Sequence, residues 1–175
     1  LAEAEVEYQD KISPSIDFGF PIDAKKINAV FNLKLDMSVY VASWTTTPWT
    51  VPGNVALTVN REFDYCLIQV KEDSKEYGLL IGKDLIESTL ERIEVKIFEI
   101  LGTCKGIELE GLEAKHPYLD RPSKFVLGDH VTTEVGTGIV HTAPGHGLED
   151  YIMAQEYDLE VLSPVKNNGT FNSDE

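Results

Sequence analysis

The chain has 175 residues, of which 42% are hydrophobic, and a formal net charge of −15. This length and apolar content suffice for a sizeable core, so we expect one domain over 1–175. Such an acidic chain lacks the basic face of a free-standing nucleic-acid binder, but this does not exclude a module that receives the end of a nucleic acid held elsewhere.

The first part of the chain predicts two strands and a linker-like start. The ends, at about 1–12 and 166–175, have the composition of linkers, and a turn is expected over 166–170. Residues 13–21 alternate apolar and small side chains and predict an edge strand. Residues 36–44 alternate with period two, which predicts a half-buried strand. That strand leads directly into an unusual polar segment.

This segment, 44–54, packs four threonines and an asparagine between two tryptophans and two prolines. Pro48 and Pro52 each fix φ near −65° and push the preceding residue out of the helical region. We therefore predict a stiff, non-helical loop that holds small polar groups beside apolar walls. On spacing alone, a threonine-rich bulge with a structural tryptophan remains an equal alternative.

Short strands continue after this loop, and the pattern changes to a helical period only twice. Many short strands with about two helices predict an α+β fold with a strand-rich, barrel-like core and a few peripheral helices. We predict strands at 55–59, 63–71, 77–81, 95–101, 105–112, 125–127 and 131–133, and helices at 83–92 and 148–157.

A second polar segment, 136–151, combines a glycine-rich turn, a short apolar strand, a Pro-Gly-His-Gly corner and a helix start. Asp150 falls in the first turn of that helix, where the helix dipole alone is a sufficient structural reason for a carboxylate. The functional alternative is that Asp150 faces a pocket together with His141. For His141 itself, the ordinary alternative is a core histidine bonded to a backbone carbonyl.

Several motif classes are excluded. Gly136-Thr137-Gly138 lacks the third glycine of a dinucleotide fingerprint, and no nucleophile motif of the serine or cysteine type is present. His141, His146 and Asp150 are conceivable metal ligands, but Pro144 breaks any helical spacing and no cysteine joins them. We therefore expect no metal and no cofactor.

The two cysteines, Cys66 and Cys104, form no CxxC motif. They predict buried thiols in a reducing compartment, although a disulfide between them stays open. The acidic start of the chain does not look like a signal peptide, and no apolar run reaches the length of a membrane span. We expect a cytoplasmic protein that makes no membrane contact.

The two polar segments carry a family resemblance. Trp44-Thr-Thr-Thr-Pro-Trp-Thr50 with Pro52-Gly53-Asn54 resembles the threonine-rich segment of the editing domain of bacterial-type isoleucyl-tRNA synthetase, and 136–151 resembles that domain's second signature. Residues 1–8 and 128–133 match as well. The valyl and leucyl relatives have arginine where this chain has Thr47 and lack the His-Thr pair at 141–142.

The chain departs from many relatives at 148–149, but Asp150 is retained. Aminoacylation signatures are not seen, so the chain resembles the excised insertion domain. The resemblance implies the editing-domain fold of class I synthetases.

The resemblance also implies hydrolytic editing of mischarged valyl-tRNA(Ile). Valine lacks one methylene of isoleucine, and a pocket gains only about 1–3 kcal/mol from such a group, a limit for which this synthetase is itself the standard example. A second, smaller site must therefore hydrolyse the valyl ester. The implied partners are the 3′ end of tRNA(Ile) carrying valine, with valyl-adenylate as a second candidate, and the rest of the synthetase. We expect a monomer.

Water attack on an aminoacyl ester needs an ammonium anchor, donors to the developing oxyanion and a positioned water. The resemblance assigns catalytic roles to Thr45, Thr46, Asn54 and Asp150, and substrate binding to Thr47, Trp49, His141 and Asp150. Asp150 suits the ammonium, and the threonine hydroxyls suit the ester, the ribose or the water. Asn54 would orient the water or bind the terminal adenosine. Thr47 and His141 would bound the side-chain pocket, and Trp49 would wall the site or stack on the substrate.

Two other hypotheses stay open. One is a module that grips the aminoacylated end without hydrolysing it. The other is a metal-dependent hydrolase built on His141, His146 and Asp150.

Overall fold

The computed structural model describes residues 12–72 and 75–172. The match over 1–8, most of the linker-like start at 1–12 and the acidic tail at 173–175 therefore lie outside the described residues. The turn expected over 166–170 is confirmed, since the Lys166 N–H donates to the Thr170 carbonyl over 2.8 Å.

One mixed sheet dominates the fold. Its strands lie in the order β6-β4-β5-β2-β1-β7-β8-β3-β9. The pairs β2–β5 and β3–β8 are parallel, and the other pairs are antiparallel. The strands are β1 Ile16–Ile22, β2 Ser38–Thr45, β3 Ala56–Val59, β4 Asp64–Glu72, β5 Lys75–Gly82, β6 Phe98–Lys105, β7 Glu113–Lys115, β8 Pro122–Leu127 and β9 Val140–Thr142.

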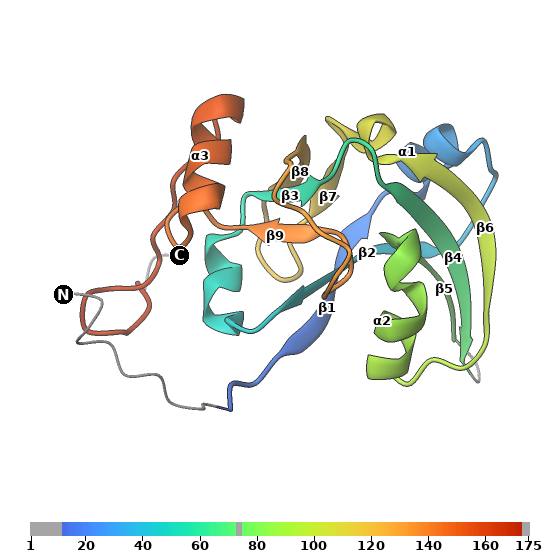
Figure 1. Ribbon diagram of the computed structural model, residues 1–175, viewed down its shortest axis with the longest axis horizontal. Coiled ribbons are helices and arrows are strands. Elements are labelled where there is room, and N and C mark those ends of the chain that lie inside the picture. The colour runs from blue at the N-terminus through green and yellow to red at the C-terminus, as the bar shows by residue number, and fades with distance from the viewer. Residues whose placement is uncertain (1–11, 73–74, 173–175) are drawn as a thin grey trace.

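The described chain also forms three α-helices, α1 Ala24–Phe31, α2 Ile86–Arg92 and α3 Leu148–Tyr157. Figure 1 shows α3 at one end of the molecule, α2 beside β4, β5 and β6 at the other, and β9 running between them. The predicted α+β fold with a strand-rich core and few helices is confirmed.

The sheet curls so that its β9 end approaches β2, in the middle of the strand order. Side chains bridge the gap: the Thr137 hydroxyl donates to the Ala42 carbonyl over 2.8 Å, and the Ser43 hydroxyl donates to the Ile139 carbonyl over 3.1 Å. The strand order nevertheless ends at β6 and β9, so the sheet is curved but not closed.

Apolar side chains fill the inside of this curve. Phe20, Val41, Leu57 and Phe125 have no exposed surface and belong to one cluster, which α1 helps to cover. A second cluster lies between the outer face of β4 and β5 and the buried side of α2. This core supports the end of β2 and the start of β9, where the two polar segments lie.

Two expectations about strands are wrong, and a third holds only in part. β1 lies inside the strand order, but residues 16–21 pair with β2 alone and the contact with β7 is at Ile22, so the expected edge strand is open on one side along most of its length. Part of the strand predicted at 105–112 is a 3₁₀ turn over Gly106–Leu109, where a Cβ on Gly106 would lie 2.0 Å from the Asn60 carbonyl oxygen. The run 131–133 forms no strand and instead crosses the edge of a cavity.

The non-helical loop is also a correction, because Pro48–Gly53 forms a 3₁₀ helix. Pro48 occupies its first position, where no backbone donor is needed, and a φ near −65° suits a 3₁₀ turn. The i→i+3 bonds run from the Thr50 N–H to the Thr47 carbonyl and from the Asn54 N–H to the Val51 carbonyl, each 3.0 Å long. The loop is thus stiff, as expected, but helical.

Helix α1 was not expected. Its signals are the ends: the Asp23 carboxylate accepts from the Lys25 N–H over 2.8 Å, and Asn32 closes the helix in the left-handed region. Such caps are typical of helix ends. In between, Ala24, Ile27 and Phe31 share one face and pack on the core, but the helix has only eight residues, so this period is short.

Both cysteines are free and buried, as predicted, and burial raises the pKa of the Cys104 thiol to about 12. Among the described residues, none of the helices has the length and apolar content needed to cross a membrane.

Tyr65 ties the core to the second polar segment. Its buried hydroxyl donates to the Gly138 carbonyl over 2.9 Å and accepts from the Asn60 N–H over 2.9 Å. Tyr65→Phe leaves both backbone groups buried without this partner, so we expect the free energy of unfolding to fall by about 2 kcal/mol. Urea denaturation measures the change.

The control is Tyr118→Phe, at a side chain that is 61% exposed. It should change the free energy of unfolding by no more than about 0.5 kcal/mol. Equal effects of the two substitutions would contradict this account of Tyr65.

Candidate functional site

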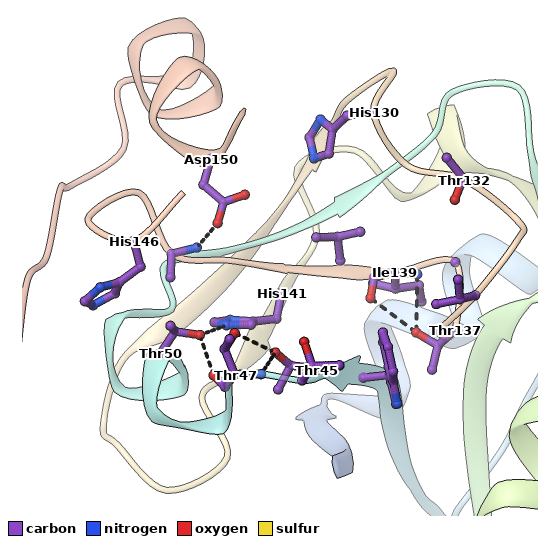
Figure 2. Close-up of a pocket in the computed structure, with 17 residues that line it drawn as sticks. Thr45, Thr47, Thr50, His130, Thr132, Thr137, Ile139, His141, His146 and Asp150 are labelled. Atoms are coloured by element: carbon purple, nitrogen blue, oxygen red, sulfur yellow. Dashed lines mark hydrogen bonds between the residues drawn. The ribbon is translucent and has the colours of Figure 1, made fainter. Parts of the chain in front are cut away.

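The two polar segments enclose one cavity of about 300 Å³. The end of β2 and the following loop form one side, and β9 with the start of α3 forms the other (Figure 2). The residues that line it are Trp44, Thr45, Thr46, Thr47, Thr50, His130, Thr132, Val135, Gly136, Thr137, Gly138, Ile139, Val140, His141, Ala143, His146 and Asp150.

A row of threonines forms the β2 side of the cavity. The Thr45 hydroxyl oxygen accepts from the Thr47 N–H over 3.0 Å and lies 3.2 Å from the Thr47 hydroxyl. Thr45 is buried, whereas Thr46 and Thr47 are exposed. The row therefore combines one hydroxyl of fixed position with two that a ligand can reach.

Strand β9 brings His141 over this row. It pairs antiparallel with β3, with His141 opposite Leu57. The His141 Nε2 atom lies 2.8 Å from the Thr50 hydroxyl, and Nδ1 lies 3.1 Å from the Asn54 amide nitrogen. Burial lowers the pKa of His141 to about 4, with smaller contributions from the charges of His116 and His146. The imidazole is thus neutral at physiological pH.

Asp150 lies on the α3 side. Its Oδ2 atom accepts from the Ala143 N–H over 2.8 Å, and Figure 2 shows the other oxygen turned away from that amide. Burial raises the pKa of this carboxyl, whereas the Ala143 N–H and the nearby His130 and His146 lower it. A carboxylate withdrawn from water in this way favours a cationic partner.

The structure brings together five of the seven predicted site residues: Thr45, Thr46, Thr47, His141 and Asp150 all line the cavity. Asn54 is fully buried behind His141 and is not a lining residue. Trp49 is half exposed and lies outside the lining, with its ring 5.4 Å from His146 and perpendicular to it. The roles predicted for all seven residues stay predictions.

Other lining residues had no predicted role, apart from His146 in the hypothesis of a metal-dependent hydrolase. The ring nitrogens Trp44 Nε1, His130 Nε2 and His146 Nε2 are buried and have no hydrogen-bond partner among the described residues. Trp44 was visible in the first polar segment, but His130 was assigned only to a turn. Its position on the cavity wall depends on how 128–139 crosses the sheet.

The described residues contain no group of three or more histidine, cysteine, aspartate or glutamate side chains placed to hold a metal ion. Of the three conceivable ligands, His141 has both ring nitrogens in hydrogen bonds. The His146 Nε2 atom lies against Gly53, where a Cβ would come within 3.2 Å of it.

Comparison with known proteins supports the resemblance. No family model matches the chain. It is 47% identical to isoleucine--tRNA ligase of Coxiella burnetii (strain Dugway 5J108-111) and 49% identical to that of Shewanella sp. (strain W3-18-1), in each case over 99% of this chain. It covers 19% of each relative, so it spans about a fifth of their length.

Solved structures agree on the fold. The P. knowlesi cytosolic leucyl-tRNA synthetase editing domain matches with a TM-score of 0.66 and 16% identity, covering 86% of this chain and 66% of that one. The crystal structure of GlLeuRS-CP1 matches with a TM-score of 0.67 and 15% identity, covering 85% and 66%. The predicted resemblance to an isoleucyl-tRNA synthetase editing domain is thus confirmed, and the fold is that of synthetase editing domains.

The buried neutral His141 makes stability depend on pH. Its pKa is about 4 in the folded chain and 6.5 as the reference, so between these values the unfolded chain binds a proton that the folded chain does not. The neutral His141 therefore imposes no loss of stability above about pH 6.5, and the free energy of unfolding falls as the pH drops from there toward 4. We expect the free energy of unfolding to fall by about 2 kcal/mol between pH 7 and pH 5 on account of His141.

Urea denaturation at the two pH values tests this expectation. His141→Gln should lose that share of the pH dependence, whereas the smaller share of His116, whose pKa burial also lowers, should remain. An identical pH dependence in parent and variant would contradict it.

Proposed function

We propose that this chain hydrolyses the ester bond of mischarged valyl-tRNA(Ile), as the editing domain of an isoleucine--tRNA ligase. The observation that carries the proposal is the single cavity that unites the threonine row, His141 and Asp150. At about 300 Å³ it is at the lower end of ligand sites, which suits a small aminoacyl group. The sequence similarity to isoleucine--tRNA ligases supports the choice of amino acid and tRNA.

Asp150 binds the α-ammonium group of the aminoacyl ester. The bond from the Ala143 N–H holds the carboxylate in place, so little freedom is lost when a substrate binds. Because burial disfavours the bare carboxylate, the ammonium restores favourable electrostatics at this position. This contact would fix the acyl carbon between α3 and the threonine row.

The threonine row serves the reacting ester. The exposed hydroxyls of Thr46 and Thr47 can donate to the carbonyl oxygen, which becomes the oxyanion when water attacks. Thr45, fixed by the Thr47 N–H, can hold the water or the ribose hydroxyl. Water adds to the acyl carbon, the bond to the ribose oxygen breaks, and that oxygen takes up the proton which the water loses. His141 is not assigned as the base, because both its nitrogens are engaged.

Size selection is assigned to His141 and Thr47, which both line the cavity. His141 is 8% exposed, and its ring lies 6.1 Å from that of Phe18 in an edge contact, so it has little room to yield. A longer side chain than valine would overlap the ring, and overpacking of this kind typically costs about 1–3 kcal/mol.

The partners follow from this function. We propose that the 3′ end of tRNA(Ile) carries valine into the cavity, that valyl-adenylate is a second substrate, and that the rest of the synthetase holds the tRNA. We also propose that 1–175 forms one domain and acts as a monomer. The alternatives, a non-hydrolytic binding module and a metal-dependent hydrolase, are separated by deacylation with and without a chelator.

Removing the anchor should remove activity. Asp150→Asn keeps the shape of the side chain but loses its charge, so we expect valyl-tRNA(Ile) deacylation to fall by about 10- to 100-fold. Release of labelled valine by the isolated chain measures it. Glu149→Gln, at the exposed neighbour in the same helical turn, is the matched control and should act like the parent. Equal rates for all three chains would exclude Asp150 as the anchor.

Removing the imidazole should open the sieve. His141→Ala should retain hydrolysis of valyl-tRNA(Ile) and begin to hydrolyse correctly charged isoleucyl-tRNA(Ile), because the ring no longer blocks the extra methylene. Paired deacylation rates on the two substrates give the ratio, and a chelator arm tests the metal-dependent alternative. If the ratio of the two deacylation rates is the same as in the parent, Thr47 remains the residue that excludes isoleucine. Loss of activity with the chelator would favour the metal-dependent hydrolase.

A further inference from the structure

A chain of hydrogen bonds runs from β8 through Asn54 and His141 to the threonine row. We propose that Asn54 and Ser123 are positioning residues that hold His141 in its Nε2–H tautomer and thereby make this polar side chain an apolar wall of the cavity. The tautomer stands on the hydrogen-bond geometry alone, whereas its use as a wall rests on the proposed editing function.

The direction of the bonds begins at the Asn54 amide. The Ala56 backbone oxygen, 2.8 Å away, can only accept, so the nearer amide atom is the NH₂ group. The Ser123 hydroxyl donates to the Asn54 carbonyl oxygen over 2.5 Å. The Ala56 carbonyl therefore fixes the orientation of an amide that has no exposed surface, and the Ser123 hydroxyl supplies the donor that its oxygen needs.

This orientation decides which nitrogen of His141 carries the proton. The Asn54 NH₂ group lies 3.1 Å from Nδ1, and because it can only donate, Nδ1 must accept. A neutral imidazole has one donor and one acceptor, so the proton lies on Nε2. Burial, which lowers the pKa of His141 to about 4, keeps the ring in this neutral form.

The hydrogen bonds on the Nε2 side of the His141 ring agree with this assignment. The Nε2–H group donates to the Thr50 hydroxyl oxygen over 2.8 Å, and the Thr50 hydroxyl donates in turn to the Thr47 carbonyl over 2.9 Å. That carbonyl also accepts from the Thr50 N–H. Each donor thus meets an acceptor, and the chain of bonds ends on the backbone of the threonine row.

The consequence concerns the surface that His141 presents to a ligand. Because both nitrogens are engaged, the part of the ring left to face the cavity is carbon. An aliphatic acyl side chain such as that of valine can pack against such an edge without leaving a polar group unpaired. Asn54 and Ser123 would therefore influence selection without touching the substrate.

The experiment is NMR of the chain labelled with ¹⁵N-histidine, because long-range ¹H–¹⁵N spectra distinguish protonated from unprotonated ring nitrogens. The signals of His141 are assigned by their loss in His141→Gln. We expect the Nε2–H form in the parent at pH 7. Asn54→Asp presents an acceptor in place of the donor, so Nδ1 should gain a proton. The control is Asn60→Asp, at a partly buried asparagine whose side chain bonds the Val131 carbonyl and the Glu62 N–H, and it should leave the spectrum of His141 unchanged.

A parent chain in the Nδ1–H form, or an Asn54→Asp chain that keeps the Nε2–H form, would overturn the proposal. The parent spectrum decides the tautomer even where Asn54→Asp does not fold. Ser123→Ala tests the outer residue: it leaves the Asn54 oxygen without its donor, so we expect the ¹⁵N shifts of the His141 ring to move from those of the parent, and unchanged shifts would remove Ser123 from the positioning role.

Deacylation then tests the wall. Asn54→Asp should lower kcat/KM for valyl-tRNA(Ile) by about tenfold or more, since it places a charge behind the apolar edge. If Asn54→Asp switches the tautomer of His141 but leaves kcat/KM unchanged, His141 does not act as an apolar wall for the substrate. If the parent does not hydrolyse valyl-tRNA(Ile), the proposed function is refuted, but the NMR result on the His141 tautomer is unaffected.

Discussion

The antiparallel pairing of β9 with β3 is the constraint on which the site depends. It places His141 opposite Leu57, and so within hydrogen-bond distance of Thr50 and Asn54, which lie 91 and 87 residues earlier in the chain. The preceding turn is fastened by Tyr65 and by the Gly82 N–H, which donates to the Thr137 carbonyl over 2.8 Å. Without this pairing, the two polar segments would be separate loops with no common cavity.

Buried polar groups fix the geometry of the site, and they also reduce the stability of the fold wherever one of them lacks a partner. A hydrogen-bonded network in a low-dielectric interior is strong when every group has a partner and destabilising when one is lost. His141 gains a fixed position but opposes folding in acid, and Asp150 gains a fixed position at the cost of its hydration. Meanwhile the net charge of −15 gives this chain little attraction for phosphate. In the proposed function, the cavity would therefore recognise the aminoacyl group, and the rest of the synthetase would supply affinity for tRNA.

Local patterns predicted much of the fold. The alternation over 36–44 and the amphipathic period over 83–92 correspond to β2 and α2, and the helix expected over 148–157 is α3. The two segments that form the cavity were also visible, because threonine, histidine and aspartate stand beside glycine and proline in both. The failures have physical causes. Helix α1 is only eight residues long, so its apolar period is short and its caps are a large part of its signal. Pro48–Gly53 forms a 3₁₀ helix, which prolines permit. Contacts such as Ser123 to Asn54 depend on strand register across 69 residues, which no local pattern encodes.

The central claim is that this one cavity binds a valyl ester and excludes its isoleucyl counterpart. The most direct measurement is an NMR titration of the ¹⁵N-labelled chain with a non-hydrolysable valyl-adenosine amide and, separately, with the isoleucyl analogue. The account predicts saturable shifts for the valyl compound centred on Thr46, Thr47, His141 and Asp150, and much weaker ones for the isoleucyl compound. Equal binding of both compounds, or shifts centred on the separate cavity beside α2 that Tyr40 and Tyr77 line, would contradict it.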